Sequence, residues 1–179
     1  MEPIWVEDVK SRINRNNTLL FTSLSPCLNT LSRLFATHSH QTLILWAFTC
    51  VSGPLRFMQI KYPNVSPLFT IDEICKKWSQ GLIKMKEAKA TILALHHEAK
   101  CLMDSVDASI FHGIAQAYSC IHTPTHVLGL PIYELTSLVR HYGLPRAIPY
   151  VEEKVREYQE TLLKVAGETH LFSWASFIH

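Results

Sequence analysis

Charge almost disappears from one long stretch of this sequence, and that stretch constrains the fold more than any other feature. From Cys101 to Val139 the only ionised side chains are Asp104, Asp107 and Glu134. Charged residues are seldom fully buried, so a stretch with so few of them is expected in the middle of the molecule. The surrounding block, residues 71–142, is helical in its pattern almost throughout. The sequence therefore predicts a core made of packed helices.

The rest of the chain shows the same helical periodicity, with turn residues between the apolar segments. No sustained apolar/polar alternation and no Asn-Gly or Asp-Gly hairpin turn competes with it. We therefore predict an all-α fold, a single-domain bundle of about seven or eight helices. The helices are expected at about residues 26–35, 39–62, 70–81, 84–103, 107–121, 124–142 and 151–166.

Proline and capping residues predict how several of these helices begin or bend. Gly53 and Pro54 are expected to kink or interrupt the second helix, because proline removes a backbone donor. Thr70, with Glu73 three residues later, has the pattern of a capping box at the start of the third helix. Pro131 falls inside the helix predicted at 124–142, so we expect a kink there.

Both ends of the chain are expected to be attached to this bundle. Residues 1–40 are predicted to be an N-terminal extension packed on the bundle, with residues 1–25 irregular. Residues 41–179 are predicted to form the helical domain. The last twelve residues, 168–179, hold several large apolar side chains, which are uncommon in a free tail, so we expect this tail to dock on the bundle.

The cysteines and the N-terminus indicate a cytoplasmic protein. Five cysteines stand at widely spaced positions, 27, 50, 75, 101 and 120. An odd, dispersed set fits neither a disulfide framework nor a zinc knuckle, and free thiols are usual in the cytosol. The N-terminus is acidic where a signal peptide would be basic and then apolar. The most apolar run, Leu43–Val51, is too short to span a bilayer, so no membrane partner is expected.

The distribution of charge gives no indication of a nucleic-acid partner. The net charge is only +2, and the basic residues are dispersed along the chain. The densest groups are Lys76 with Lys77, and Lys84, Lys86 and Lys89. On a helix these side chains point in several directions, whereas a nucleic-acid footprint is denser and one-sided.

Ten histidines make a metal site the main chemical hypothesis. His122 and His126 are four residues apart, a spacing that lets two imidazoles on one helix bind a zinc ion. However, the predicted helix begins between them, at Pro124, and no His-Glu-x-x-His sequence is present. One alternative that stays open is a metal-dependent helical enzyme that uses His97, His122 and His126. The opposite interpretation is that these histidines pack and form hydrogen bonds in the core.

No other pattern predicts catalysis or a cofactor. Cys120 and His122 are two residues apart, so a helix would point them in different directions. The sequence contains no glycine-rich phosphate loop and no dinucleotide-binding fingerprint. We therefore assign no catalytic residue, no cofactor and no cofactor-binding residue.

Four segments together resemble a known family. They are LILWAFTC (43–50), IDEICKKWSQG (71–81), EAKATILALHHEAK (87–100) and AYSCIHTPTHVLGLPIYEL (117–135). In these segments the chain resembles a family of bacterial putative immunity proteins, the group described as similar to the fifth class of polymorphic-toxin immunity proteins. The resemblance covers residues 43–142, and Pro124 and Pro131 depart from its pattern. The matching positions include Trp46, Trp78, Gly81, His97, His122, His126, Gly129 and Tyr133.

The resemblance implies an intracellular protein that binds a cognate toxin domain and blocks it without catalysis. Such a protein would bind through a few aromatic or arginine anchors. Candidate anchors outside the predicted core stripes are Trp5, Tyr62, Phe69 and Arg146. Besides the metal-dependent enzyme, a homo-oligomeric helical scaffold, for example a homodimer, stays open, because apolar residues greatly outnumber charged ones (47% against 18%).

Overall fold

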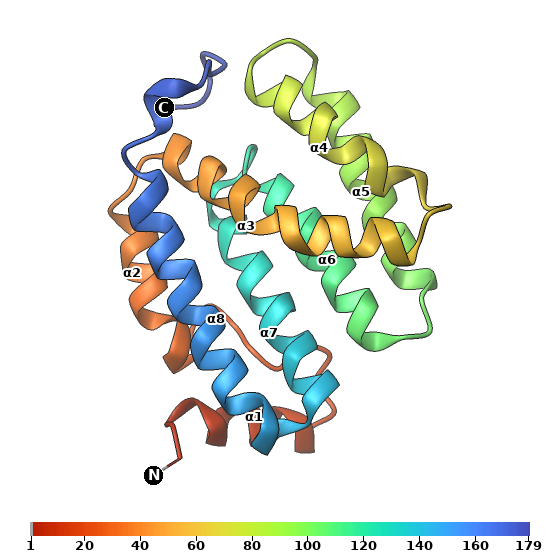
Figure 1. Ribbon diagram of the computed structural model, residues 1–179, viewed down its shortest axis with the longest axis vertical. Coiled ribbons are helices and arrows are strands. Elements are labelled where there is room, and N and C mark those ends of the chain that lie inside the picture. The colour runs from red at the N-terminus through yellow and green to blue at the C-terminus, as the bar shows by residue number, and fades with distance from the viewer. Residues whose placement is uncertain (1) are drawn as a thin grey trace.

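The chain folds as a bundle of α-helices, as seen in a computed structural model that describes residues 2–179 (Figure 1). The fold is 75% helical, and residues 2–179 contain no strand, which confirms the predicted all-α class. The helices are α1 (Trp5–Asn14), α2 (Asn29–Ala36), α3 (His40–Lys61), α4 (Ser66–Ser79), α5 (Met85–Cys101), α6 (Ser105–Ser119), α7 (Gly129–Tyr142) and α8 (Leu144–Val165). Three short 3₁₀ helices are η1 (Pro26–Leu28), η2 (Pro124–Leu128) and η3 (Thr169–Leu171).

The charge-poor helices lie in the middle of the bundle, as predicted. α6 packs against α3, α4, α5 and α7. A Cβ on Gly113 would meet the Cβ of Tyr133 at 3.3 Å, so α6 and α7 approach closely at this small residue. The buried side chains and glycine of α6 are Asp107, Ser109, Phe111, Gly113, Ile114, Ala115, Ala117 and Tyr118.

α3 continues through Gly53 and Pro54, so the predicted interruption is wrong. The residue before a proline is normally pushed out of the helical region by contact between its Cβ and the proline ring. Gly53 has no Cβ, so this contact with the ring of Pro54 is absent. The glycine therefore makes the helical conformation before Pro54 acceptable.

By length and composition alone, α3 could cross a membrane, because one window of it has a mean hydropathy of 1.3. Its contacts instead favour a helix of the bundle core. Trp46 is completely buried, and its Nε1 donates a hydrogen bond to the carbonyl oxygen of Tyr158, 2.9 Å away. The Trp46 ring also packs edge-on against Phe35, with the ring centroids 4.7 Å apart.

The first 25 residues are not irregular as predicted, because they contain α1. Trp5, Val6 and Val9 of this helix are buried, and the helix contacts α8. Further along, the Leu20 N–H donates to Oγ1 of Thr136 over 3.1 Å. This segment thus shares the core of the bundle, while the division of the chain at residue 40 stays a prediction.

α4 begins at Ser66 rather than Thr70, so the predicted capping box is wrong. Pro67 lies in the first turn of the helix, where its missing N–H has no intrahelical partner to lose. Thr70 is therefore inside the helix. Glu73 pairs with Lys77 one turn further on, with Oε1 and Nζ 2.6 Å apart.

Pro131 and Pro149 also differ from the prediction. The segment 124–142 is divided into η2 and α7, which begins at Gly129. Pro131 is thus in the first turn of α7, where it removes no helical hydrogen bond. α8 begins at Leu144, directly after Gly143 with its φ of +76°, and it includes Pro149.

Candidate functional site

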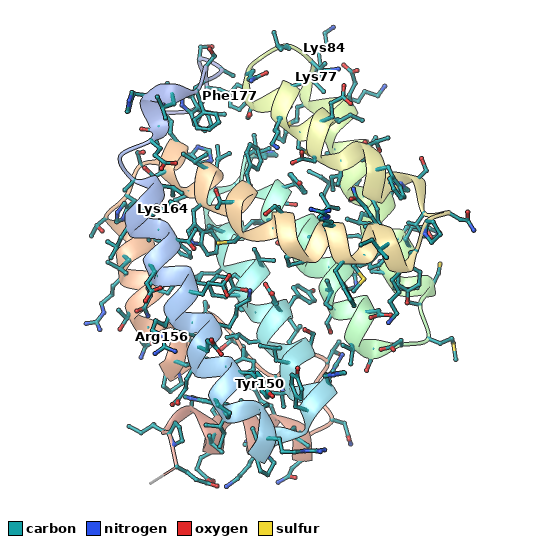
Figure 2. The ribbon with its side chains drawn as sticks, viewed as in Figure 1. Lys77, Lys84, Tyr150, Arg156, Lys164 and Phe177 are labelled. Atoms are coloured by element: carbon teal, nitrogen blue, oxygen red, sulfur yellow. The ribbon has the colours of Figure 1, made fainter. Side chains whose placement is uncertain are left out.

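An open cleft of about 760 Å³ lies between the α4–α5 connection and the C-terminal tail, residues 168–179. We call it the Trp78 cleft. The two segments that flank it meet at one end of the bundle, the top of the view in Figure 1. Figure 2 shows Phe177 on the tail side and Lys84 on the opposite side. The lining residues are Trp78, Gln80, Gly81, Ile83, Lys84, Met85, His122, Trp174, Ala175, Ser176 and Phe177.

Gly81 allows the two sides of the cleft to meet. It follows the end of α4 with a φ of +76°, a conformation that residues with a side chain rarely adopt, as expected for a helix-ending glycine. A Cβ there would also lie 3.3 Å from the Cβ of Ala175. The Ala175 N–H donates to the Ser79 carbonyl over 2.8 Å, so the tail is hydrogen-bonded to the end of α4.

The tail docks on the bundle, as predicted, but not through all of its apolar side chains. Ala175 and Ile178 are buried, and the His40 N–H donates to the His179 carbonyl over 3.2 Å. By contrast, Phe172 and Phe177 are each 46% exposed. The backbone, Ala175 and Ile178 therefore attach the tail, which leaves part of its aromatic surface free.

Trp78 forms the aromatic side of the cleft. Its side chain is largely buried, on the same face of α4 as the buried Ile71 and Cys75. The Trp78 ring lies 6.0 Å from the ring of Phe177 and 6.4 Å from the imidazole of His122, centroid to centroid. One indole thus joins α4, the end of α6 and the tail.

A second, smaller hollow of about 200 Å³ adjoins this cleft, and we call it the His126 pocket. Trp78 and His122 line both hollows, so these two side chains separate them. Its other lining residues are Lys89, Ile92, Leu93, His96, Ser119, Thr123 and His126. His122 and His126 thus face one pocket although η2 begins between them.

His96 and His112 form a pair between α5 and α6. Their Nδ1 atoms are 2.8 Å apart, and the His112 ring packs on Tyr133 with centroids 5.2 Å apart. Burial, and then the neighbouring imidazole, lower the pKa of His96 to about 4, and burial also lowers the pKa of His112. Both imidazoles are therefore neutral near pH 7, as a structural hydrogen-bonded pair requires.

The structure separates the histidines considered for a metal site. His122 and His126 line the His126 pocket, but His97 is exposed and lies beside Cys101, with Nε2 and Sγ 3.9 Å apart. Residues 2–179 contain no group of three or more His, Cys, Asp or Glu side chains placed to hold a metal ion. The third histidine of the pocket is His96, which is already bonded to His112. The metal hypothesis thus gains no support from this geometry, and elemental analysis of the purified protein tests it.

Four of the five cysteines show no sign of nucleophilic activation. All five are free thiols. Burial raises the pKa of Cys27 to about 12 and raises those of Cys50, Cys75 and Cys120 further. These thiols stay protonated near neutral pH, whereas a catalytic cysteine needs a lowered pKa.

Sequence reasoning missed three groups in which a tyrosine and a lysine share one carboxylate. Tyr118 donates to Asp72, which also pairs with Lys76, and both contacts measure 2.8 Å. The other two groups are Tyr62, Asp107 and Lys61, and Tyr158, Glu134 and Lys154. Each carboxylate joins different helices, so these groups stabilise the bundle. The available signal was the isolation of Asp107 and Glu134 in a charge-poor segment, since a lone buried acid needs partners.

The proposed binding anchors have different environments. Trp5 is buried, so its assignment as a surface anchor is wrong. Tyr62 is half-buried and donates to Asp107. Arg146 is exposed, with Nε donating to the Tyr142 carbonyl over 2.9 Å, and Phe69 is 50% exposed. None of these residues lines the Trp78 cleft or the His126 pocket.

Positions of the resemblance gather around the two hollows instead. Trp78, Gly81 and His122 line the Trp78 cleft, and His126 lines the adjoining pocket. A Cβ on Gly129 would lie 2.5 Å from the Cβ of Gln116. Of the remaining matched positions, Trp46 lies in the core and Tyr133 packs on His112, whereas His97 is exposed.

Comparison with known proteins gives one family. The model of the family described as "Imm-5 like putative immunity protein" matches residues 33–165. No curated protein and no solved structure matches the chain. The matched range runs from α2 to the end of α8, so the α4–α5 side of the Trp78 cleft lies inside it and the tail side lies outside it.

Proposed function

This chain belongs to the family of Imm-5 like putative immunity proteins, and on that basis we propose that it binds a cognate toxin protein and neutralises it without catalysis. Membership of this family implies a protein partner in general. The structural observation that best supports the proposal is the Trp78 cleft, where family-matched residues line an open, aromatic surface. We propose that the toxin and this chain meet in the cytoplasm, because free thiols such as the five of this chain are usual in that reducing compartment.

The cleft has the composition of a protein-binding surface. Binding energy in such surfaces comes from a few aromatic or long side chains that lose water on contact, surrounded by polar residues. Phe177 and Met85 are 46% and 44% exposed at the cleft and can be covered by a partner. Gln80, Lys84 and Ser176 supply polar groups among the lining residues.

Inhibition through such a surface is stoichiometric. The titratable side chains that line the cleft and the pocket are Lys84, Lys89, His96, His122 and His126, and His96 is already bonded to His112. Within the described residues no hydrogen bond or ion pair joins one of these imidazoles to a carboxylate that would orient it as a catalytic base. One molecule of this protein should therefore occupy one molecule of toxin.

A titration of the purified proteins tests the proposal. The toxin domain encoded by the neighbouring gene is assayed with increasing amounts of this chain. Toxin activity should fall linearly, reach zero near one equivalent, and coincide with a 1:1 complex in gel filtration with light scattering. Inactivation by a small fraction of one equivalent would indicate catalysis. Full toxin activity in excess protein, with no complex, would contradict the proposed function.

A further inference from the structure

We propose that the Trp78 cleft binds an acidic segment of the toxin. In this arrangement an apolar side chain of that segment packs against Phe177 and Met85 beside the largely buried Trp78, and its carboxylates lie at Lys84 and Lys89. The inference rests on the proposed function and adds to it the surface used and the chemistry that it recognises.

The first argument is the charge of the lining. Among the residues that line the Trp78 cleft and the His126 pocket, the only charged side chains are Lys84 and Lys89, and no aspartate or glutamate is present. Both lysines are exposed, and neither forms an ion pair within the described residues. The neighbouring acid is Glu87, which accepts the backbone N–H of Lys84 over 3.2 Å at the start of α5. The cleft therefore presents positive charge that this chain leaves uncompensated.

The lysines of the adjacent helix α4 are compensated. On α4, Lys76 pairs with Asp72 at 2.8 Å and Lys77 with Glu73 at 2.6 Å, each one helical turn apart. A third lysine, Lys61, lines a different hollow of about 350 Å³. Asp104 and Asp107 line that hollow too, and Lys61 pairs with Asp107. Unpaired positive charge is thus found at the Trp78 cleft and the His126 pocket and not at every hollow on this surface.

The second argument is the apolar surface beside these lysines. Phe177 and Met85 are nearly half exposed at the Trp78 cleft, and Leu93 is 55% exposed at the His126 pocket. A segment with carboxylates alone would leave this surface in water, and an apolar segment alone would leave the two ammonium groups unmatched. A segment that combines both kinds of side chain satisfies the whole cleft.

The two sides of the cleft have different relations to the family. Trp78, Gly81 and Lys84 lie within the matched residues 33–165, whereas Trp174 and Phe177 lie outside them. The tail side is therefore a place where this chain can differ from other members. We expect contacts with Phe177 to determine which toxin this protein accepts.

A peptide experiment tests the cleft without the toxin. The probes are the acetylated peptides Glu-Phe-Glu-Glu-Phe and Gln-Phe-Gln-Gln-Phe, titrated into the complete ¹⁵N-labelled protein. The acidic peptide should shift the indole N–H signals of Trp78 and Trp174, and the amide peptide should not. The double variant Lys84→Glu with Lys89→Glu should lose these shifts. Equal shifts with both peptides, shifts only elsewhere, or no shift would overturn the inference.

A second experiment uses the toxin domain encoded by the neighbouring gene. The double variant Lys84→Glu with Lys89→Glu should weaken binding by about tenfold or more, mainly through slower association at low salt. The matched control is Arg156→Glu with Lys164→Glu, the same change of charge on exposed positions of α8 (Figure 2). The control should keep the affinity within about twofold, and circular dichroism confirms that both variants are folded.

The outcomes separate this inference from the proposed function. If the double cleft variant binds and neutralises the toxin as well as the wild type, the inference is overturned while the proposed function stands. If the acidic peptide binds in the cleft but the wild-type chain neither binds nor inhibits the toxin, the proposed function fails and the chemistry of the cleft stands. The variant Phe177→Ala adds a test of the tail side, since it should weaken toxin binding without altering the salt dependence.

Discussion

The Nδ1 atoms of His96 and His112 lie 2.8 Å apart, so one imidazole donates its proton to the other and the pair joins α5 to α6. A pair of this kind requires at least one neutral ring. Burial first, and then the charge of His112, lower the pKa of His96 from 6.5 to about 4. The unfolded chain therefore binds more protons than the folded one between these pH values, and the stabilisation present above pH 6.5 is lost as the pH falls towards 4.

The variant His112→Gln tests this pH dependence. A glutamine keeps a hydrogen-bond partner for His96 but removes the second ionisable ring, so the free energy of unfolding should fall less steeply on acidification than in the wild type. Urea unfolding at pH values from about 5 to 7.5 measures it. The control His170→Gln, at an exposed position in the tail, should keep the wild-type slope. Identical slopes for His112→Gln and the wild type would show that the pair does not control acid stability.

Replacement of Lys154 should show how strongly the free energy of unfolding depends on the partners of Glu134. Tyr158 donates to Glu134 at 2.5 Å, and Lys154 Nζ lies 3.1 Å from Glu134 Oε1. We expect Lys154→Met to lower the free energy of unfolding at pH 7 by about 3 kcal/mol, because it leaves a buried carboxylate without its counter-charge. The control Lys164→Met, exposed on the same helix, should change it by less than about 0.5 kcal/mol.

The loss of unfolding free energy caused by Lys154→Met should also depend on pH. The pKa of Glu134 determines whether this loss grows or shrinks on acidification. Burial raises the pKa of Glu134, although Lys154 and Tyr158 act in the opposite direction. A pKa that is higher in the folded than in the unfolded state means that protonation of Glu134 stabilises the fold. This stabilisation is complete below the unfolded pKa and disappears as the pH rises through the folded pKa. The difference in unfolding free energy between the wild type and Lys154→Met should therefore shrink as the pH is lowered from 7. A deficit that grows on acidification would contradict a buried, charge-dependent Glu134.

Gly129 should tolerate no side chain. A Cβ at this position would lie 2.5 Å from the Cβ of Gln116, an atom fixed to the backbone of α6. We expect Gly129→Ala to destabilise the protein by about 1–3 kcal/mol, because α6 and α7 must move apart. At Gly167 nothing lies within 4 Å of a Cβ, so Gly167→Ala should stay within about 0.5 kcal/mol of the wild type. Equal melting temperatures for the two variants would disprove the close approach.

The helices and their buried faces were predictable because apolar side chains recur at helical spacing. The stripe of α5, with Ala88, Ile92, Leu95 and Ala99, is buried as its pattern indicates. Helix ends were harder to predict, since Ser66–Pro67 and Thr70 are both acceptable starts and only packing decides between them. α1 was missed because its apolar residues stand among charged ones in a short segment.

The site was less predictable than the fold. Trp78, Gly81 and His122 were recognisable only by resemblance, and nothing in local spacing places them beside a tail about 50 to 100 residues further on. The pairs between tyrosines and carboxylates, such as Tyr118 with Asp72, also join residues far apart in sequence. Contacts of this kind depend on how helices pack together, which periodicity does not specify.

Co-expression with the neighbouring toxin tests the central claim most directly. Cells that carry an inducible copy of the toxin domain are compared with and without this protein, and survival is counted after induction. The account predicts that the wild-type protein restores survival, and that the double variant Lys84→Glu with Lys89→Glu restores it less well than Arg156→Glu with Lys164→Glu. Equal killing in the presence and absence of the wild-type protein, with the protein present and folded, would contradict the account.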